Sequence, residues 1–244
     1  VSFLRVATGE IVTESITANI ADIRERITRA ALRAGRNPES IRLMAVCKTV
    51  GAERVRQALD AGITLFGENY VQEAREKIPL VGEAAEWHMI GHLQTNKAKY
   101  VANLFEWIHS VDRHELAQEL DKRAARTGRR LNVLMEVNVS GEVSKNGIEP
   151  QRAAGLARQI SVLPNLHLRG LMTMPPYSDN PEDSRPYFVA LRNLRDEITR
   201  AAIPGISMDE LSMGMTDDFE VAIEEGATIV RVGRAIFGER RKKA

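Results

Sequence analysis

Eight apolar runs, separated from one another by helix-like segments, constrain the fold of this chain more than any other feature. The runs lie at 41–49, 63–66, 87–90, 105–111, 131–139, 166–174, 208–213 and 227–232. Continuous hydrophobicity over such short runs is typical of strands buried on both faces of a parallel sheet. Eight strands alternating with helices in 244 residues fit a (β/α)8 TIM-type barrel better than an open doubly wound sheet, so we predict a barrel of the α/β class.

An additional helix is expected before the first strand. Apolar residues recur at three- and four-residue steps over 11–35, and Gly35 and Pro38 end the pattern. Only about ten residues follow the last strand, so the eighth barrel helix is missing and the helix at 11–35 is expected to cover that gap. No linker or sharp change in composition divides the chain. We therefore predict one domain over 1–244, with its core at about 11–240 and a basic tail at 240–244.

The composition excludes several classes of function. The chain is 43% hydrophobic and 27% charged, which is typical of a soluble globular protein. The chain has 34 Lys and Arg residues and 33 Asp and Glu residues, so its net charge is close to zero. It therefore has no overall positive electrostatic field that would attract nucleic acid or an anionic membrane. The basic cluster at 240–243 is interpreted as a solvated tail rather than a binding patch. Without an apolar excess, we expect a monomer.

The cysteine count and the hydropathy indicate a cytoplasmic protein. Cys47 is the single cysteine, so no intrachain disulfide can form and a reducing compartment is expected. One cysteine and five scattered histidines offer no zinc-binding spacing. No apolar run reaches the roughly 18 residues that a membrane-spanning helix needs.

Lys48 is the first candidate site residue. It lies at the C-terminal end of the first apolar run, on the same face as Met44 and Val46. A cation at the end of a buried strand costs free energy unless it has a partner or a task, although a lysine that has already reached solvent in the following loop is the alternative. Active sites of TIM barrels lie at this end of the strands.

The loops after strands seven and eight are candidates for holding a phosphate group. They cover 212–216 and 233–235, the positions where such barrels often bind phosphate. Gly214 allows the backbone to approach an anion closely, and the free amides of the following helix favour negative charge. Asp217 and Asp218 offer an alternative, because their side chains could satisfy that helix end themselves.

Two arginines add positive charge to the same end of the barrel. Arg234 follows the glycine of the second loop, and Arg231 interrupts the last apolar strand. A structural salt bridge between Arg231 and Glu136 of strand five is the alternative interpretation. A lysine beside an anion site and a guanidinium can form a Schiff base with a carbonyl compound, so the residues predict a phosphorylated aldehyde as ligand.

The chain also resembles a known family, from residue 15 to residue 240. The stretches that carry the resemblance are AVCKT at 45–49, FGENY at 66–70, WHMIGHLQTNK at 87–97, GLMTM at 170–174, LSMGMTDD at 211–218 and VRVGRAIFG at 230–238. They closely resemble the pyridoxal phosphate homeostasis proteins (YggS/PROSC type), whose barrel is like the N-terminal domain of alanine racemase. The resemblance implies that pyridoxal 5'-phosphate (PLP), the vitamin B6 cofactor, binds here.

The resemblance also implies a role for individual residues. PLP would form an aldimine with Lys48, and Arg231 would face its pyridine nitrogen. The phosphate contacts would come from Ser212, Thr216, Gly233 and Arg234, with Asn69 and Met172 near the ring. Family members often carry a small hydroxyl residue where this chain has Arg234, so the backbone amide is expected to serve there.

The function that follows is a cofactor carrier rather than an enzyme. An arginine cannot protonate the pyridine nitrogen as a carboxylic acid would, so the ring is a poor electron sink. The resemblance implies intracellular PLP homeostasis, in which PLP is buffered or delivered to PLP-requiring apoenzymes. One alternative is a weak amino-acid racemase that uses Tyr70 or Tyr177 as a second base, since we expect no added domain to supply one. The other is a Schiff-base aldolase acting on sugar phosphates.

Other polar residues are interpreted as structural. His88 and His92 are expected to pack or to order loops, because neither has an evident acidic partner nearby in sequence. Lys145, in the loop after strand five, is expected to be solvated, and it is the next candidate for the Schiff base if Lys48 is not the reactive amine.

Overall fold

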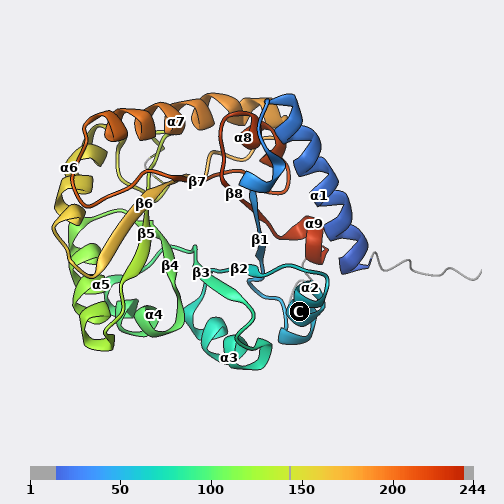
Figure 1. The fold of residues 1–244 in the computed structure, drawn as a ribbon, viewed down its shortest axis with the longest axis horizontal. Coiled ribbons are helices and arrows are strands. Elements are labelled where there is room, and N and C mark those ends of the chain that lie inside the picture. The colour runs from blue at the N-terminus through green and yellow to red at the C-terminus, as the bar shows by residue number, and fades with distance from the viewer. Residues whose placement is uncertain (1–14, 143, 239–244) are drawn as a thin grey trace, which may run out of the picture.

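Eight parallel strands close into a barrel in chain order, with β8 paired to β1. The computed structural model describes residues 15–142 and 144–238. The strands are β1 Arg42–Val46, β2 Leu65–Glu68, β3 Glu86–Met89, β4 Trp107–Val111, β5 Leu131–Glu136, β6 Leu166–Met172, β7 Glu210–Ser212 and β8 Ile229–Val232. Figure 1 shows the helices surrounding these strands. The predicted barrel is confirmed, and most strands are shorter than the apolar runs because residues such as Lys48 already belong to the following loops.

Helices connect the strands on the outside of the barrel. They are α1 Ile16–Arg33, α2 Ala52–Asp60, α3 Val71–Val81, α4 Ala98–Leu104, α5 His114–Thr127, α6 Pro150–Ser161, α7 Arg185–Arg200, α8 Phe219–Glu224 and α9 Arg234–Phe237, with 3-10 turns at Pro38–Ser40, Thr95–Lys97 and Pro181–Ser184. Within the described ranges, none of these helices is both long and apolar enough to cross a membrane.

Helix α1 closes the outer layer where a full eighth helix would stand. Ser15 caps it by accepting a hydrogen bond from the amide of Ala18, at 3.1 Å. Its buried face consists of Ile16, Ile20, Ile23, Ile27, Ala30 and Ala31. The helix packs against α2, α8 and the short α9 (Figure 1), so it covers the gap as the sequence predicted. The predicted beginning of this helix at 11–14 and the basic tail at 240–244 lie outside the described residues.

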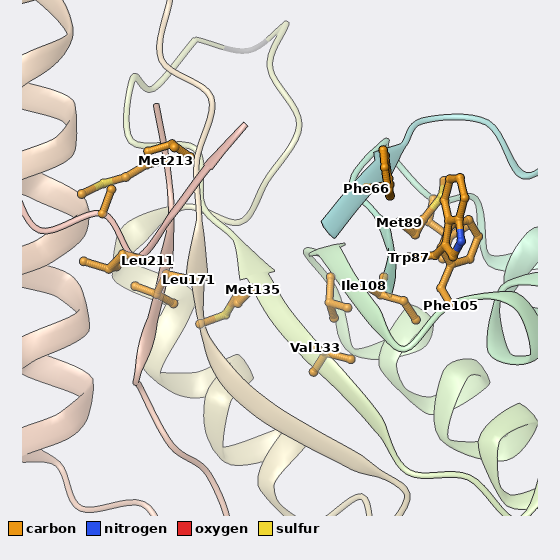
Figure 2. Close-up of a cluster of buried hydrophobic side chains, with 14 of the residues drawn as sticks. Phe66, Trp87, Met89, Phe105, Ile108, Val133, Met135, Leu171, Leu211 and Met213 are labelled. Carbon is orange, nitrogen blue, oxygen red and sulfur yellow. The ribbon is translucent and has the colours of Figure 1, made fainter. Parts of the chain in front are cut away.

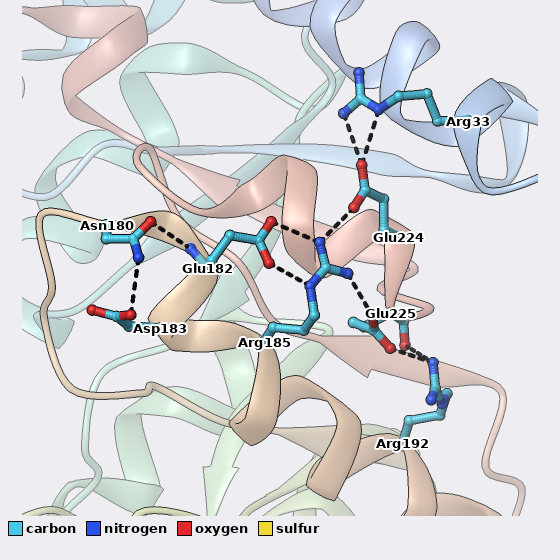
Figure 3. A network of polar contacts seen from close by, with 8 residues as sticks. All are labelled: Arg33, Asn180, Glu182, Asp183, Arg185, Arg192, Glu224 and Glu225. Atoms are coloured by element: carbon cyan, nitrogen blue, oxygen red, sulfur yellow. Dashed lines mark hydrogen bonds and ion pairs between the residues drawn. The ribbon is translucent and has the colours of Figure 1, made fainter.

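A polar seam joins α1 to the neighbouring helices α7 and α8. The guanidinium of Arg185 donates to Glu224 and Glu225, both at 2.7 Å. Arg33 from α1 also pairs with Glu224, and Arg192 with Glu225 (Figure 3). Because these groups are only partly buried, each pair contributes modestly, and the network mainly fixes how the three helices meet.

The apolar core has an outer and an inner part. The large outer part fills the space between strands and helices, and Figure 2 shows a section of it from Phe66 and Trp87 to Met213. Two small apolar clusters are separate from it, and they consist of Met44, Leu65, Ile90 and Ile229, and of Trp107, Leu134 and Met172. The inward-facing positions of the strands also carry buried polar residues, including His88, His109 and Ser212. Polar groups at these positions need hydrogen-bond partners within the barrel.

Candidate functional site

A cavity of about 460 Å³ opens at the C-terminal ends of the strands. Its volume lies in the range of small-molecule sites. Six of the nine predicted site residues line it, namely Lys48, Asn69, Thr216, Arg231, Gly233 and Arg234. The other three predicted residues, Met172, Ser212 and Gly214, do not contribute to its lining. The structure thus brings the predicted amine, the guanidinium and both predicted loops to one cavity.

The chain on either side of Lys48 is anchored by helix α3. The ammonium group of Lys77 donates to the carbonyl oxygen of Cys47 at 2.7 Å. The amide of Thr49 donates to the carboxylate of Glu73 at 2.7 Å, and Thr49 adopts a left-handed backbone with φ 64°. Non-glycine residues rarely take this conformation, so these two contacts help to hold a strained turn. The turn carries Lys48 to the cavity.

Lys77 belongs to a buried ion pair that the sequence analysis missed. It contacts the carboxylate of Glu68, which is fully buried at the end of β2. Burial raises the pKa of Glu68, while the hydrogen bond and charge of Lys77 oppose that rise. The thiol of Cys47 donates to the same carboxylate at 3.2 Å. A signal was present in the sequence, because Lys77 occupies the buried stripe of α3 together with Ala74 and Val81.

Arg231 is buried in the barrel and extends to the cavity. Its guanidinium donates to the hydroxyl of Ser212 and to the carbonyl oxygen of Thr173, both at 2.8 Å. The predicted alternative was an ion pair with Glu136, but Arg231 is hydrogen-bonded to these neutral oxygens and Glu136 acts on it only through its electrostatic field. Burial lowers the pKa of Arg231 to about 10, and the charges of Asp218 and Glu136 oppose this shift. Arg231 therefore remains a cation at neutral pH.

Ser212 lies beneath the cavity and joins Arg231 to a pair of histidines. Its hydroxyl is 3.0 Å from Nδ1 of His109, and Nε2 of His109 is 2.8 Å from Nδ1 of His88. Nε2 of His88 is in turn 2.9 Å from the carboxylate of Glu86. His88 is packed, as predicted, but the expectation that it lacks a nearby acidic partner was wrong, since Glu86 lies two residues before it.

His92 lies at the rim, with its Nδ1 3.8 Å from a carboxylate oxygen of Asp112. One donor atom each from His92, Asp112 and Glu136 lie within 4.8 Å of one another, and such nitrogen and oxygen donors are types that divalent metal ions accept. Asp112 is, however, already paired with Arg113 at 2.5 Å. Burial raises the pKa of Glu136 to about 7, which reduces the negative charge of the cluster further. These residues therefore do not require a metal ion to balance their charge.

The loop after β7 partly satisfies its own polar groups. Asp218 accepts a hydrogen bond from the amide of Met215 at 2.7 Å, but this amide lies before α8, and the side chain of Asp218 does not cap the helix as the alternative interpretation expected. Asp217 instead pairs with Arg234 across the cavity rim, at 2.6 and 2.7 Å. The side chain of Arg234 thus has a carboxylate partner. Thr216 lines the cavity between these groups.

Gly214 has a packing role that the sequence did not indicate. Its backbone is left-handed, with φ +90°, and a Cβ at this position would lie 2.5 Å from the Cβ of Ala222 in α8. Glycine is therefore required for the loop to lie against the helix. Gly233 is similarly confined, because a Cβ there would lie 3.2 Å from the carbonyl oxygen of Val46. Both glycines keep the loops close to the barrel mouth.

Met172 is buried in the interior cluster with Trp107 and Leu134, below the residues that line the cavity.

The two tyrosines of the racemase alternative and the alternative Schiff-base lysine lie in different places. Tyr177 lines the cavity, and its hydroxyl donates to Asp179 at 2.8 Å. Tyr70 is exposed outside the cavity lining, and the ammonium group of Lys145 lies 3.5 Å from the carbonyl oxygen of Pro175.

Comparison with known proteins identifies the family. The model of the alanine racemase N-terminal domain family matches residues 12–241. A pyridoxal phosphate homeostasis protein of Aquifex aeolicus is 48% identical over 223 residues, which cover 91% of this chain and 97% of the relative. The chain belongs to the pyridoxal phosphate homeostasis protein family. The family member of Escherichia coli is 43% identical over 233 residues, covering 92% of this chain and 97% of the relative.

Solved structures agree with this membership. PipY of Synechococcus elongatus, solved with PLP bound, is 34% identical with a TM-score of 0.81, and the match covers 91% of this chain and 100% of PipY. Alanine racemase of Corynebacterium glutamicum has a TM-score of 0.65 at 16% identity, and the match covers 91% of this chain and 62% of the racemase. The second likeness concerns the fold alone.

Proposed function

We propose that this protein binds PLP through a Schiff base to Lys48 and serves intracellular PLP homeostasis. The observation that carries the proposal is the cavity in which Lys48, Arg231 and the loops after β7 and β8 meet. The name of the relatives and the PLP in PipY support the same ligand class. PLP supplies an aldehyde that condenses reversibly with an amine, so a single lysine suffices to retain it and to release it.

The residues of the cavity fit such a ligand. The volume of about 460 Å³ admits one small phosphorylated molecule. Thr216 and the backbone at Gly233 and Arg234 would hold the phosphate, with the guanidinium of Arg234 shared with Asp217. Arg231 would face the pyridine nitrogen as a hydrogen-bond donor. Asn69 lines the cavity and would contact the ring, whereas Met172 would support it from below.

We propose a carrier without turnover, because the cavity offers poor groups for carbanion chemistry. Arg231 keeps its proton at neutral pH and cannot transfer it to a ring nitrogen, which disfavours the electron-sink role of PLP. Tyr177 lines the cavity, but its hydrogen bond to Asp179 raises the pKa of its hydroxyl. That shift keeps the hydroxyl protonated at neutral pH, so little phenolate is present to accept a proton. The racemase alternative therefore lacks an apt second base at this position.

An absorbance titration tests the proposed ligand. Addition of PLP to the purified protein should produce the visible band of a protonated Schiff base, and Lys48→Ala should abolish this band while it leaves the circular dichroism unchanged. Lys145→Ala is the matched control, because Lys145 does not line the cavity. An unchanged band in Lys48→Ala would refute the role of Lys48. A protein that stays colourless with PLP would instead favour the aldolase alternative.

Deuterium exchange separates the carrier from the racemase. In deuterated buffer, the PLP-loaded protein should incorporate no deuterium at the α-carbon of alanine or serine above the level of free PLP. Incorporation that depends on Lys48 would identify a racemase.

We further propose that the protein acts as a cytoplasmic monomer and passes PLP to PLP-requiring apoenzymes. A transfer assay with a PLP-free apoenzyme, in which activity returns faster than with an equal amount of free PLP, would support delivery, and size-exclusion chromatography would test the monomer.

A further inference from the structure

A chain of four hydrogen bonds runs through the barrel interior to the cavity. It begins at Glu86, the first residue of β3, whose other carboxylate oxygen pairs with Arg42 at 2.5 Å. It then passes through His88, His109 and the hydroxyl of Ser212, with separations of 2.9, 2.8 and 3.0 Å. It ends 2.8 Å further on, at the guanidinium of Arg231. This series of hydrogen bonds from Glu86 to Arg231, here called the relay, thus connects the N-terminal end of the barrel with the guanidinium that borders the cavity.

The protonation of the two ends fixes the direction of every bond between them. Glu86 pairs with the guanidinium of Arg42 through its other oxygen, so this carboxylate is ionised at neutral pH and only accepts. His88 must therefore carry its proton on Nε2, which leaves its Nδ1 as an acceptor. At the other end, Arg231 can only donate, so the oxygen of Ser212 accepts from it.

The two hydrogen bonds in the middle of this series can then each run in only one direction. Nδ1 of His88 accepts, so His109 carries its proton on Nε2 and accepts at Nδ1 from the hydroxyl of Ser212. Both rings are neutral, since burial lowers the pKa of His88 to about 4 and that of His109 well below its ordinary value. Each ring nitrogen then has one partner, as buried polar groups require.

We propose that His88 and His109 are positioning residues that hold Ser212 as the hydrogen-bond acceptor of Arg231, and that Glu86 sets the direction of this relay. The relay fixes one orientation of the guanidinium through Ser212, while the carbonyl oxygen of Thr173 holds its other end. A long side chain held at two points is preorganised to present its remaining donors to a ligand.

The relay also changes the expected role of Ser212. Its single hydroxyl hydrogen is directed to His109, so Ser212 does not donate to a phosphate while the relay is intact. This revises the resemblance-based expectation that Ser212 is a phosphate contact, and it assigns Ser212 to Arg231 instead. The consequence for the cofactor rests on the proposed function, whereas the protonation of the histidines does not.

The substitution Glu86→Gln makes the direction of the relay testable. In this variant the amide oxygen would keep the hydrogen bond from Arg42, so the amide NH2 group would face His88 and donate to its Nε2. In the reversed relay, His88 and His109 both carry their protons on Nδ1. The oxygen of Ser212 then accepts from His109, and the hydroxyl hydrogen of Ser212 is free to bind elsewhere. A change at one end of the barrel would then alter the hydrogen bonding beneath the cavity.

Nitrogen-15 NMR of histidine-labelled full-length protein without PLP tests the assignment directly. The five histidines are assigned by single substitutions, and long-range correlations report which ring nitrogen carries the proton. We expect neutral Nε2–H tautomers for His88 and His109 in the wild-type protein. A protonated ring or an Nδ1–H tautomer at either position would overturn the relay.

Two comparisons complete the test. Glu86→Gln should move both rings toward the Nδ1–H tautomer, and Glu119→Gln, which removes a carboxylate paired with Arg123 on α5, should leave them unchanged. Unaltered Nε2–H tautomers in Glu86→Gln would overturn the directing role of Glu86. Cooperative unfolding of each variant verifies that the fold is intact.

Titration with PLP then tests the role of Ser212. The tautomer of His109 should stay the same when the visible Schiff-base band forms, and a switch of His109 to Nδ1–H would show that Ser212 turns to the ligand and would overturn its assignment to Arg231. His109→Phe should weaken PLP binding about tenfold, a loss equivalent to one hydrogen bond of ordinary strength. Unchanged affinity in this variant would contradict the positioning role. Absence of any band in the wild-type protein would refute the proposed function without affecting the tautomer result.

Discussion

Replacing Lys77 by methionine removes the cation from the buried pair behind Lys48. The carboxylate of Glu68 is fully buried and the lysine nearly so, and no solvent compensates the charge that remains. Removal of one partner of a buried ion pair costs about 3–5 kcal/mol. Loss of the hydrogen bond to the carbonyl oxygen of Cys47 adds about 1 kcal/mol. We therefore expect Lys77→Met to lower the free energy of unfolding by about 4–6 kcal/mol at pH 7.5.

The cost should depend on pH with a defined sign. Burial raises the pKa of Glu68 in the native protein, and without Lys77 nothing of comparable strength opposes this rise. Folded Lys77→Met then binds a proton at Glu68 more readily than the unfolded chain does. Its stability should therefore recover relative to wild type as the pH falls from 7.5 to 5.5, and it should decline as the pH rises through the raised pKa.

Urea unfolding followed by circular dichroism measures both effects. Lys122→Met, on the exposed face of α5, is the matched control and should change stability by less than about 0.5 kcal/mol. The double variant with Glu68→Leu removes both charges and should lie within about 1.5 kcal/mol of wild type. A cost below about 1 kcal/mol for Lys77→Met at pH 7.5, or one that grows on acidification, would refute the reasoning.

Two further predictions concern Gly214 and Cys47. Gly214→Ala should destabilise the protein by about 2–4 kcal/mol, because the added methyl group would clash with Ala222 and the backbone is left-handed. Gly155→Ala, within α6 and with open space around it, should be neutral or stabilising in the same urea unfolding. Equal effects of the two substitutions would contradict this account. The thiol of Cys47 is buried and its pKa is raised by burial, so mass spectrometry should detect alkylation by iodoacetamide only after unfolding. Rapid alkylation of the native protein would show that the thiol of Cys47 is accessible to the reagent, which would contradict its burial.

The fold could be predicted from the sequence because its signals are local. A short apolar run followed by an amphipathic helix specifies each unit without information from the rest of the chain. Eight repetitions of this unit leave the barrel as the economical closure. The position of Lys48 at a strand end and of two loops after β7 and β8 follows from the same count, which is why these groups meet at one cavity. Asn69, which also lines the cavity, was predicted from the family resemblance alone.

The supporting residues could not be predicted in the same way, since they meet only when the barrel closes. His109 and Ser212 are 103 residues apart in the chain, and nothing local indicates that an imidazole and a hydroxyl will face each other. Arg231 was assigned Glu136 as an alternative partner on charge alone, whereas strand register and depth gave it neutral oxygens. Depth within the barrel, and not residue type, decided which groups became partners.

The central claim is that the amine of Lys48 is the group that captures PLP at the barrel mouth. Reduction of the PLP-loaded protein with borohydride, followed by proteolysis and peptide mass spectrometry, fixes the attachment site permanently. The account predicts one phosphopyridoxyl group per chain, on Lys48. A label on Lys145, or one spread over several surface lysines, would contradict it.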